Sequence, residues 1–413
     1  MLRIGQHRQA SGEANPHLRS TVMAYDHEQD RQTGSGAPRW TELPDVPGVV
    51  LREWLARTPE AVIDPEQPII DTHHHLWDRR PRPGSPEGTL SQSEIDALPK
   101  WIGRLPLCYL ADDLMEDIRG GGHNVVDTVF IDSMAMYRAD GGADFSVGET
   151  EFVNGIAAMA ASNLYGPAAR CCGAIVSYTD LTLGAAVEPV LLAHLAASPR
   201  FRGIRHSHAW HESPDIGNSR TAGDTPGLLA SDDFRAGFKV LDRLNLSFDS
   251  YGYYTQLGEV EDLANAFPGV TIVVNHIGGL INKGPRAAER DGAVFFEWQQ
   301  AVRSLAGCPN VVMKLGGCGM PAYGWGYEER DAPPSSAEMA TAWQPYFAEL
   351  IDAFGVERCM FESNFPIDKV SSSYTNLWNA FKRVTTALKL SATEKNALFH
   401  DCAARVYQIG TET

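Results

Sequence analysis

The feature that most constrains the fold is an alternation of apolar, β-branched runs with segments of helical periodicity, which begins near residue 68. Eight runs have the composition of buried strands: 68–76, 125–133, 171–178, 201–207, 244–251, 270–276, 311–317 and 358–364. Between most of them lie segments with helical spacing of apolar residues, such as 185–197, 232–244 and 343–354. This alternation predicts an α/β fold, a single-domain (β/α)8 TIM barrel. The alternative is a doubly wound open sheet, which is disfavoured because no G-x-G-x-x-G turn follows the first run.

The chain before this alternation has a different character. Residues 1–40 are polar, mixed in charge and aperiodic, which predicts an N-terminal extension that is disordered or packed on a partner subunit. Residues 41–66 are expected to form a helical lead-in, and residues 67–409 are expected to form the barrel.

Composition limits the classes of partner. The 413 residues are 43% hydrophobic, and 35 basic against 52 acidic residues give a net charge of -17. That balance argues against nucleic acid and anionic membranes as partners, and no apolar stretch reaches membrane-spanning length. The seven cysteines lack zinc-type spacing, which favours a reducing compartment. We therefore expect a cytoplasmic protein that binds a small molecule, with a homo-oligomer left open.

Polar side chains collect at the carboxyl ends of the expected strands. They are His73 and His75, Asp132, Arg205 and His206, Asp249 and Tyr251, His276, Lys314, and Glu362 with Asn364. In a barrel of this kind the strand ends and the loops after them form the reaction site. Exposure to water would explain any one of these residues, but it explains poorly their recurrence on most strands.

The stretch IIDTHHHLWD at residues 69–78 contributes three consecutive histidines. Because strand side chains alternate between faces, His73 and His75 are expected to share one side with Asp71. By the same rule His74 is expected to point outward as a packing residue. Two imidazoles at one strand end suit either a metal ion or an anion.

Three of these stretches together resemble the amidohydrolase superfamily: DTHHHLWD at the first strand, VVNHIGG at the sixth and CMFESNFPID at the eighth. The resemblance is to the amidohydrolase-2 branch, which includes 2-pyrone-4,6-dicarboxylate lactonase, sugar-lactone hydrolases and decarboxylases, and it covers about residues 67–409. It implies a (β/α)8 barrel with His73, His75 and His276 in the site. It also implies that Arg205 binds a substrate carboxylate.

The sequence departs from the family pattern at the eighth strand. The usual motif is G-S-D-[FW]-P, whereas this chain has Glu362, Ser363 and Asn364 before Phe-Pro. An amide cannot accept a proton at neutral pH, so Asn364 cannot be a general base. Asn364 is nevertheless kept among the catalytic candidates, with His73, His75, His276 and Glu362. Glu362 is the first candidate for that role, a histidine or Asp249 is the second, and loss of hydrolysis is the third. A structural ion pair between Glu362 and Lys314 is the competing interpretation.

The same substitution bears on metal binding. His73, His75 and His276 remain as nitrogen ligands for one divalent ion, zinc or manganese, and Glu362 could join them. Without a metal, the three histidines would polarise a carbonyl as hydrogen-bond donors. Both alternatives stay open at this point.

Further residues are candidates for substrate binding. The stretch GIRHSHAWHES contributes Arg205, His206 and His208, and two strand ends contribute Tyr251 and Lys314. The segment 314–336 is long and rich in glycine and aromatics, and we expect it to form a lid with Trp325 and Tyr327 facing a flat ligand. Burial of these rings against a neighbouring subunit is the alternative. Tyr137 is expected on the opposite wall of the site.

The function predicted from these observations is hydrolysis. We expect an amidohydrolase-like enzyme that opens a lactone, or a related carbonyl-containing ring, of a small acidic metabolite, and an aromatic-derived metabolite is one candidate. A non-oxidative decarboxylase or carbon–carbon hydrolase is the second hypothesis, and a catalytically inactive binding protein is the third. The absence of a P-loop and of a G-x-S-x-G elbow disfavours phosphate transfer and serine-esterase chemistry.

Overall fold

The computed structural model describes residues 47–80, 104–139, 141–166, 169–219, 221–223 and 226–410. The expected N-terminal extension, and the part of the lead-in before residue 47, lie outside the described residues. The chain divides into two units, 1–37 with 79–99 and 38–78 with 100–413. Every helix and strand below belongs to the second unit.

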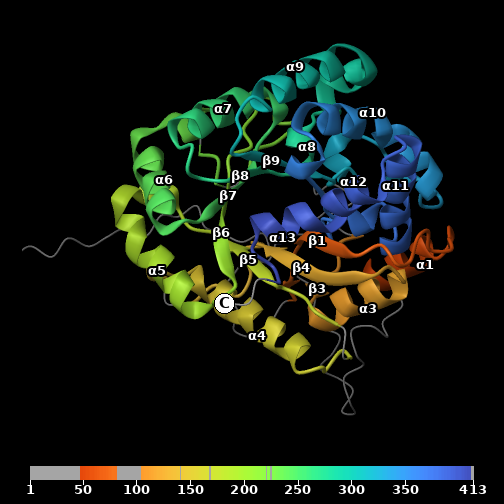
Figure 1. Ribbon diagram of the computed structural model, residues 1–413, viewed down its shortest axis with the longest axis horizontal. Helices are drawn as coiled ribbons and strands as arrows, with labels where there is room; N and C mark the ends of the chain where they lie inside the picture. Colours follow the sequence, from red (N-terminus) through yellow and green to blue (C-terminus); the bar gives the residue numbers. More distant parts are fainter. Residues whose placement is uncertain are drawn as a thin grey trace, which may run out of the picture. The chain divides into compact units, whose positions relative to one another are not determined.

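Eight parallel strands form one sheet in the order β1-β4-β5-β6-β7-β8-β9-β10 and enclose the centre of the molecule (Figure 1). Their bounds are β1 Ile69–His74, β4 Val125–Ile131, β5 Ala174–Ser177, β6 Phe201–Ser207, β7 Ser247–Tyr251, β8 Ile272–Val274, β9 Val311–Leu315 and β10 Cys359–Phe361. Each of the eight lies within a predicted run, and the predicted (β/α)8 barrel is confirmed. A small antiparallel pair, β2 (Trp77–Asp78) with β3 (Cys108–Tyr109), lies outside this sheet.

Helices surround the strands (Figure 1). Their bounds are α1 Pro47–Leu55, α3 Ala111–Gly121, α4 Val147–Ala161, α5 Glu188–Ala197, α6 Asp232–Leu244, α7 Leu257–Ala266, α8 His276–Gly279, α9 Phe295–Leu305, α10 Ser336–Phe354, α11 Tyr374–Ala387, α12 Ala392–Asn396 and α13 Cys402–Val406. In the described residues no helix combines the length and the apolar character needed to cross a bilayer.

Helix α6 shows how local sequence defines these elements. Ser231 precedes it, and its hydroxyl accepts a hydrogen bond from the Phe234 amide, while Asn245 ends it in the left-handed conformation. Phe234, Phe238 and Leu241 recur at helical spacing and are fully buried. Burial of such side chains contributes roughly 2 kcal/mol each. The apolar face therefore fixes the helix against the barrel.

The barrel closes between β1 and β10 through bonds beyond the regular ladder. The His75 amide donates to the Phe365 carbonyl at 2.8 Å, and the Asn364 amide donates to the His73 carbonyl at 2.8 Å. The Thr72 hydroxyl donates to the Phe361 carbonyl at 2.8 Å. These contacts bring the first strand beside the last one, so that His73 faces the residue that follows β10.

Strand β1 does not alternate regularly. Its register with β4 shifts between Asp71 and His74. Asp71 accepts hydrogen bonds from the Tyr374 hydroxyl of α11 at 2.9 Å and from the Ser363 amide at 2.9 Å. The prediction that Asp71 shares a face with His73 and His75 is therefore wrong, because the irregular register turns Asp71 toward the helices. His74 points outward as predicted and packs on Phe130.

The inside of the barrel has its own apolar cluster. It consists of strand residues and of the last helical segment: Ile70, Val129, Ile131, Ala174, Val176, Val273, Val312, Met360, Cys402, Ala403 and Tyr407. Helix α13 contacts both β1 and β10 and appears within the ring of strands in Figure 1. The barrel interior is thus filled by side chains.

Candidate active site

Three histidines and one glutamate meet in a single buried cluster at the carboxyl ends of the strands. The ring centroids of His73 and His276 lie 4.5 Å apart, and the Nε2 atoms of His73 and His75 lie 3.2 Å apart. Glu362 lies between His73 and His276. The sequence prediction that these separated stretches converge at one end of the barrel agrees with this geometry.

Glu362 is fully buried, and its two carboxylate oxygens each lie beside one imidazole. Its Oε1 atom accepts a hydrogen bond from the His276 amide at 3.0 Å and lies 2.6 Å from His276 Nδ1. Its Oε2 atom lies 2.8 Å from His73 Nδ1. This contact is an ion-pair distance and not a hydrogen bond, and Oε2 has no hydrogen-bond partner among the described residues.

Lys314 pairs with Asp249 and not with Glu362. The Lys314 Nζ atom lies 2.8 Å from Asp249 Oδ2, and both side chains are fully buried. Asp249 also accepts hydrogen bonds from Asn275 at 2.9 Å and from the Tyr407 hydroxyl at 3.1 Å. The alternative of a Glu362–Lys314 ion pair is therefore wrong. The position of Lys314 does not support its predicted contact with substrate, because its ammonium group is enclosed by the protein.

The imidazoles of His73 and His75 are uncharged in this environment. Burial lowers the pKa of His73 well below its usual value, and the positive charge of Lys314 lowers it further. Burial also lowers the pKa of His75, as does Arg205. His75 Nδ1 lies 2.9 Å from the Ile131 carbonyl, which can only accept, so Nδ1 carries the hydrogen. The Nε2 lone pair of His75 consequently faces His73.

His276 reaches the cluster through an unusual backbone. Strand β8 ends at Val274, and His276 and Ile277 have φ values of 54° and 50°. The Tyr323 hydroxyl donates to the His276 carbonyl at 2.9 Å. A Cβ atom on Gly317 would lie 2.4 Å from His276 Nδ1, so only glycine allows the next strand end to approach this ring.

Arg205 lies at the edge of the cluster with its side chain 11% exposed. Its Nε atom donates to Asp132 Oδ1, and its Nη2 atom donates to the Asp132 carbonyl. Its Nη1 atom lies 3.3 Å from His73 Nε2. Arginine has further N–H groups on Nη1 and Nη2, and these could meet a substrate anion. The half-buried ring of Tyr251 packs edge-on against His276, with centroids 5.5 Å apart.

Asn364 points away from the cluster. Its Nδ2 atom donates to Asp368 Oδ1 at 2.7 Å, and the Gly319 amide donates to Asp368 Oδ2 at 2.8 Å. Burial raises the pKa of the Asp368 carboxyl well above its usual value. The position of Asn364 therefore does not support its predicted catalytic role. Sequence reasoning missed Asp368, although a carboxyl four positions after the amide was a visible signal.

Three other candidates for substrate binding lie outside the cluster. His206 points to the outer face of β6, where its ring packs against Phe234 and its Nε2 atom bonds to the Thr221 carbonyl at 3.0 Å. His208 is buried with its Nε2 atom 2.8 Å from the Ser250 hydroxyl. Tyr137 packs edge-on against Phe145. These positions do not support the predicted roles.

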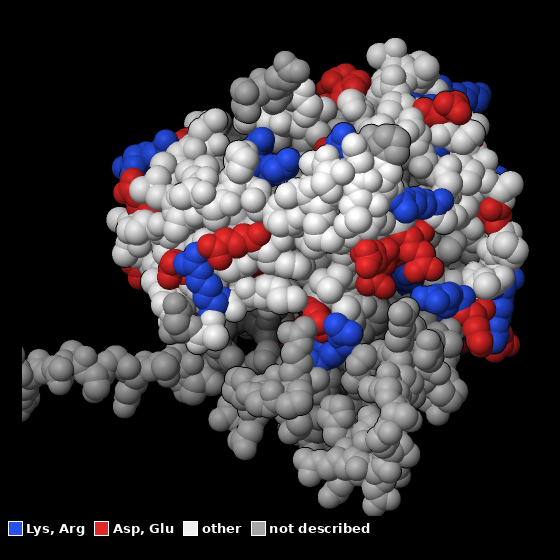
Figure 2. Space-filling view, turned by 90° about the horizontal axis from the view of Figure 1, so that it is seen from below, with Lys and Arg blue, Asp and Glu red and all other residues white. Residues whose placement is uncertain are grey.

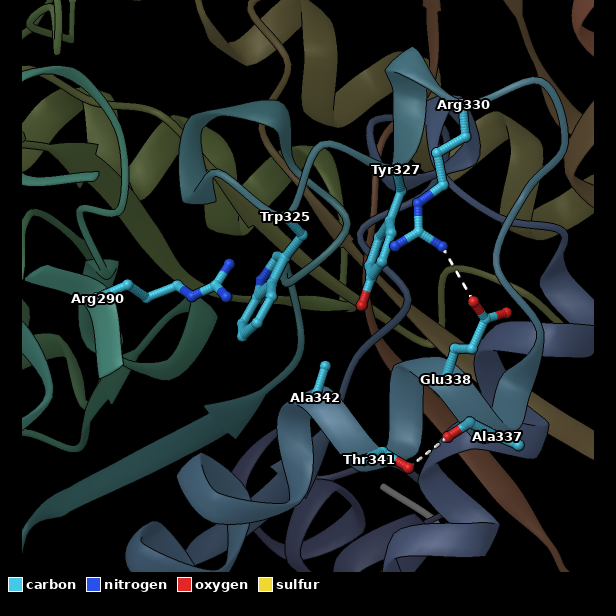
Figure 3. Close-up of a pocket in the computed structure, with 8 residues that line it drawn as sticks. All are labelled: Arg290, Trp325, Tyr327, Arg330, Ala337, Glu338, Thr341 and Ala342. Carbon is cyan, nitrogen blue, oxygen red and sulfur yellow. Dashed lines mark hydrogen bonds and ion pairs between the residues drawn. The ribbon is translucent and has the colours of Figure 1, made fainter. Parts of the chain in front are cut away.

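Trp325 and Tyr327 line a separate pocket of about 490 Å³ (Figure 3). Their rings are nearly parallel, with an interplanar angle of 11°. Trp325 packs against Tyr346 and Tyr327 against Trp343, both on α10. None of the residues that line this pocket belongs to the histidine cluster. The expected lid thus packs on its own chain, and its two rings do not contact the cluster.

The cluster meets the requirements of a divalent metal site. Ligand atoms of His73, His276 and Glu362 all lie within 4.8 Å of one another, and all three side chains are buried. Buried polar atoms normally have a partner, and Glu362 Oε2 has no hydrogen-bond partner among the described residues. Lys314 pairs with Asp249 and Arg205 with Asp132, so neither of these cations forms an ion pair with Glu362. This group contains two of the three predicted nitrogen ligands together with Glu362, which was expected to be able to join them, and His75 lies beside it.

Surface charge gives no sign of a polyanion-binding face on the side displayed in Figure 2. Acidic and basic side chains are intermingled there.

A family profile, two curated relatives and a crystal structure each match more than 80% of this chain. The profile of the family described as Amidohydrolase matches residues 70–409. The chain is 34% identical over 346 residues to an uncharacterized protein, y4mH, of Sinorhizobium fredii, covering 83% of this chain and 98% of that one. It is 25% identical over 344 residues to an L-fucono-1,5-lactonase of Burkholderia multivorans, covering 82% and 96%. A crystal structure of an amidohydrolase from the same species, with bound zinc, has a TM-score of 0.57 at 22% identity and covers 83% of this chain and 99% of that one.

Proposed function

The chain belongs to the amidohydrolase family, and from this premise we propose that it hydrolyses a lactone, or a related carbonyl-containing ring, of a small acidic molecule. The observation that carries the proposal is the buried Glu362 carboxylate between His73 and His276, with Arg205 beside them. Similarity to an L-fucono-1,5-lactonase supports the choice of a lactone. An aromatic-derived acid is the second class of substrate to test.

Arg205 would bind the anionic group of the substrate. Its guanidinium is held in place by Asp132, and the N–H groups that remain can donate to a carboxylate or a ring oxygen. Tyr251, half-buried against His276, would contact the ring of the substrate.

Glu362 and His276 would handle the proton. Glu362 accepts from His276 Nδ1, which leaves Nε2 as the unprotonated nitrogen. That nitrogen would take a proton from the attacking water and return it to the ring oxygen as the carbon–oxygen bond breaks. The pair thus has the arrangement of a base with its orienting carboxylate.

A divalent ion, zinc or manganese, would be held by His73, His276 and Glu362, with His75 adjacent. When bound, such an ion polarises a carbonyl and lowers the pKa of water. The metal-loaded form and the form with His276 as base are alternatives, and elemental analysis of the purified protein distinguishes them. One equivalent of zinc or manganese per chain supports the first alternative.

The test is turnover of L-fucono-1,5-lactone, other sugar lactones and 2-pyrone-4,6-dicarboxylate by wild-type protein and by His73→Ala, His276→Ala and Glu362→Gln. We expect each folded variant to lose about 100-fold or more in kcat/KM. His400→Ala, at a partly exposed histidine paired with Asp401, is the control and should keep full activity. Wild-type rates in the first three variants would contradict the proposal. Release of carbon dioxide would select a decarboxylase, and no turnover would favour a binding protein.

We also propose a cytoplasmic location, and the state of the cysteines is consistent with it. All seven cysteines lie in described parts of the chain, and all are free. Free thiols are typical of a reducing compartment. A homo-oligomer remains part of the proposal, to be measured by light scattering.

A further inference from the structure

The turn that follows β4 is fastened by a carboxyl group from the next helix. Glu149 of α4 accepts three hydrogen bonds on its Oε1 atom: from the Ser133 amide at 3.0 Å, the Ser133 hydroxyl at 3.2 Å and the Ala135 amide at 2.9 Å. Glu149 is fully buried. Its other oxygen, Oε2, has no hydrogen-bond partner among the described residues.

The turn requires these hydrogen bonds because its backbone is strained. Met134 and Met136 have φ values of 58° and 55°. Side chains other than glycine pay roughly 1–2 kcal/mol for this left-handed conformation, and it persists where surrounding structure determines it. Helix α4 also packs tightly on the turn, since a Cβ atom on Gly148 would lie 2.6 Å from the Met136 carbonyl.

The turn begins at the residue that holds the substrate-binding arginine. Asp132 receives Arg205 through both its side chain and its carbonyl, and Arg205 in turn touches His73. The Asp132 carbonyl is part of the peptide that leads to Ser133, whose amide donates to Glu149. A shift of the turn would therefore move both acceptors of Arg205.

We propose that Glu149 is a positioning residue for the proposed hydrolysis: it sets the turn that holds Asp132, and through Asp132 it sets Arg205 at the substrate anion. The inference rests on the proposed function and assigns a role to a side chain outside the cluster. Glu149 touches neither substrate nor reacting atoms. Its removal should therefore weaken substrate binding more than it slows the chemical step.

The protonation state of Glu149 follows from its surroundings. Burial raises its pKa to about 8, and the negative charge of Asp132 adds to the increase. The other ionisable groups nearby are Arg205, Arg138, which pairs with Asp144 and Glu151 at the surface, and His194 of α5, which bonds to Thr150 and Ser146. Burial lowers the pKa of His194 to about 4, so it is neutral. At pH 7 Glu149 is therefore protonated.

These facts predict opposite results for two substitutions. Glu149→Gln keeps a neutral group with a carbonyl oxygen for Ser133 and Ala135, and should match the wild type at pH 7. Glu149→Ala removes the acceptor. We expect KM for an acidic lactone to rise about 10-fold and kcat to change less than 3-fold. A 10-fold loss of affinity corresponds to roughly the free energy of one hydrogen bond. Glu151→Gln, on the exposed side of the same helix, is the control. Equal KM values in Glu149→Ala and wild type would overturn the proposal.

Dependence on pH provides a readout that a merely structural role would not move. Above about pH 8 ionised Glu149 adds a second negative charge beside Asp132, so kcat/KM of the wild type for an anionic substrate should fall. Glu149→Gln should lack this decrease. Retention of the full decrease in Glu149→Gln would contradict the proposal.

Two measurements remain informative if no lactone is hydrolysed. Crystal structures should show Arg205 on Asp132 in Glu149→Gln and displaced in Glu149→Ala, and an undisplaced Arg205 in the latter overturns the inference. In unfolding experiments, a carboxyl whose pKa is higher in the folded state loses its stabilising effect as pH rises from about 4.5 to 8. The stability of Glu149→Gln relative to wild type should therefore grow over that range, and a constant difference would contradict the assigned buried acid.

Discussion

At the scale of single residues, the side-chain amide of Asn364 donates a hydrogen bond to a buried carboxyl group and points away from the histidine cluster. It donates to Asp368, which also receives the Gly319 amide. A carboxyl group at position 364 would not supply this donor, so that one of two facing buried carboxyl groups would have to hold a proton. The residue that departs from the family pattern is therefore matched to its neighbour in this chain.

Asn364→Asp should consequently destabilise the protein and should not create a general base. Loss of the donor and the approach of two buried carboxyls should cost about 1–3 kcal/mol of unfolding free energy, measured by denaturant titration at pH 7. The cost should shrink at lower pH, where one carboxyl takes up a proton. Asn364→Asp combined with Asp368→Asn restores one donor and one acceptor, and should recover at least half of the loss. A fully stable single variant would show that the pair is not tightly coupled.

Three residues of the site could be predicted from the sequence. His73, His276 and Glu362 were found because each follows an apolar run at a strand end, and the structure brings these three together. Asp132, the partner of Arg205, was named as a strand-end residue without a role, and Asp368, the partner of Asn364, was not named. Local sequence does not state which side chain an acid will face.

At the scale of secondary-structure elements, the site depends on close approach between the ends of β8 and β9. His276 has a left-handed backbone, and Gly317 leaves room for its ring. The strands themselves were predicted from β-branched runs, because their composition reflects burial on both faces. The direction of each side chain was harder to predict, because the irregular register of β1 turns the Asp71 side chain away from the barrel interior.

Gly317→Ala tests this element contact. The new methyl group would lie 2.4 Å from His276 Nδ1, so the ring must move, and a displacement of about 1 Å can cost on the order of 100-fold in rate. Gly326→Ala is the matched control, because Gly326 has the same φ of 66° and no atom within 4 Å of the added Cβ. Both variants carry the backbone penalty, but only Gly317→Ala should lose activity. Equal activity in the two would show that His276 tolerates the shift.

At the scale of the whole molecule, the last segment of the chain enters the polar layer under the site. The Tyr407 hydroxyl donates to both carboxylate oxygens of Asp249, which pairs with Lys314. Lys314 Nζ lies 3.5 Å from His73 Nδ1. A chain of polar contacts thus links the C-terminal segment to the histidine cluster.

Tyr407→Phe should lower the free energy of unfolding by about 1–3 kcal/mol, because a buried carboxylate loses a donor. Tyr165→Phe makes the same chemical change where the acceptor, Asp112, is exposed, and should cost far less. Thermal unfolding of both variants at equal pH gives the comparison. Similar losses in the two variants would indicate that Asp249 does not depend on Tyr407.

Closure of the barrel between its first and last strands has a consequence for biosynthesis. His73 emerges from the ribosome early, but Glu362 follows 289 positions later (362 minus 73), so the histidine cluster lacks its carboxylate for most of translation. Contacts of such separation form slowly because the loop between them must first be ordered. Prematurely terminated products that lack the last strand should therefore have no catalytic activity, even where other parts of the barrel fold.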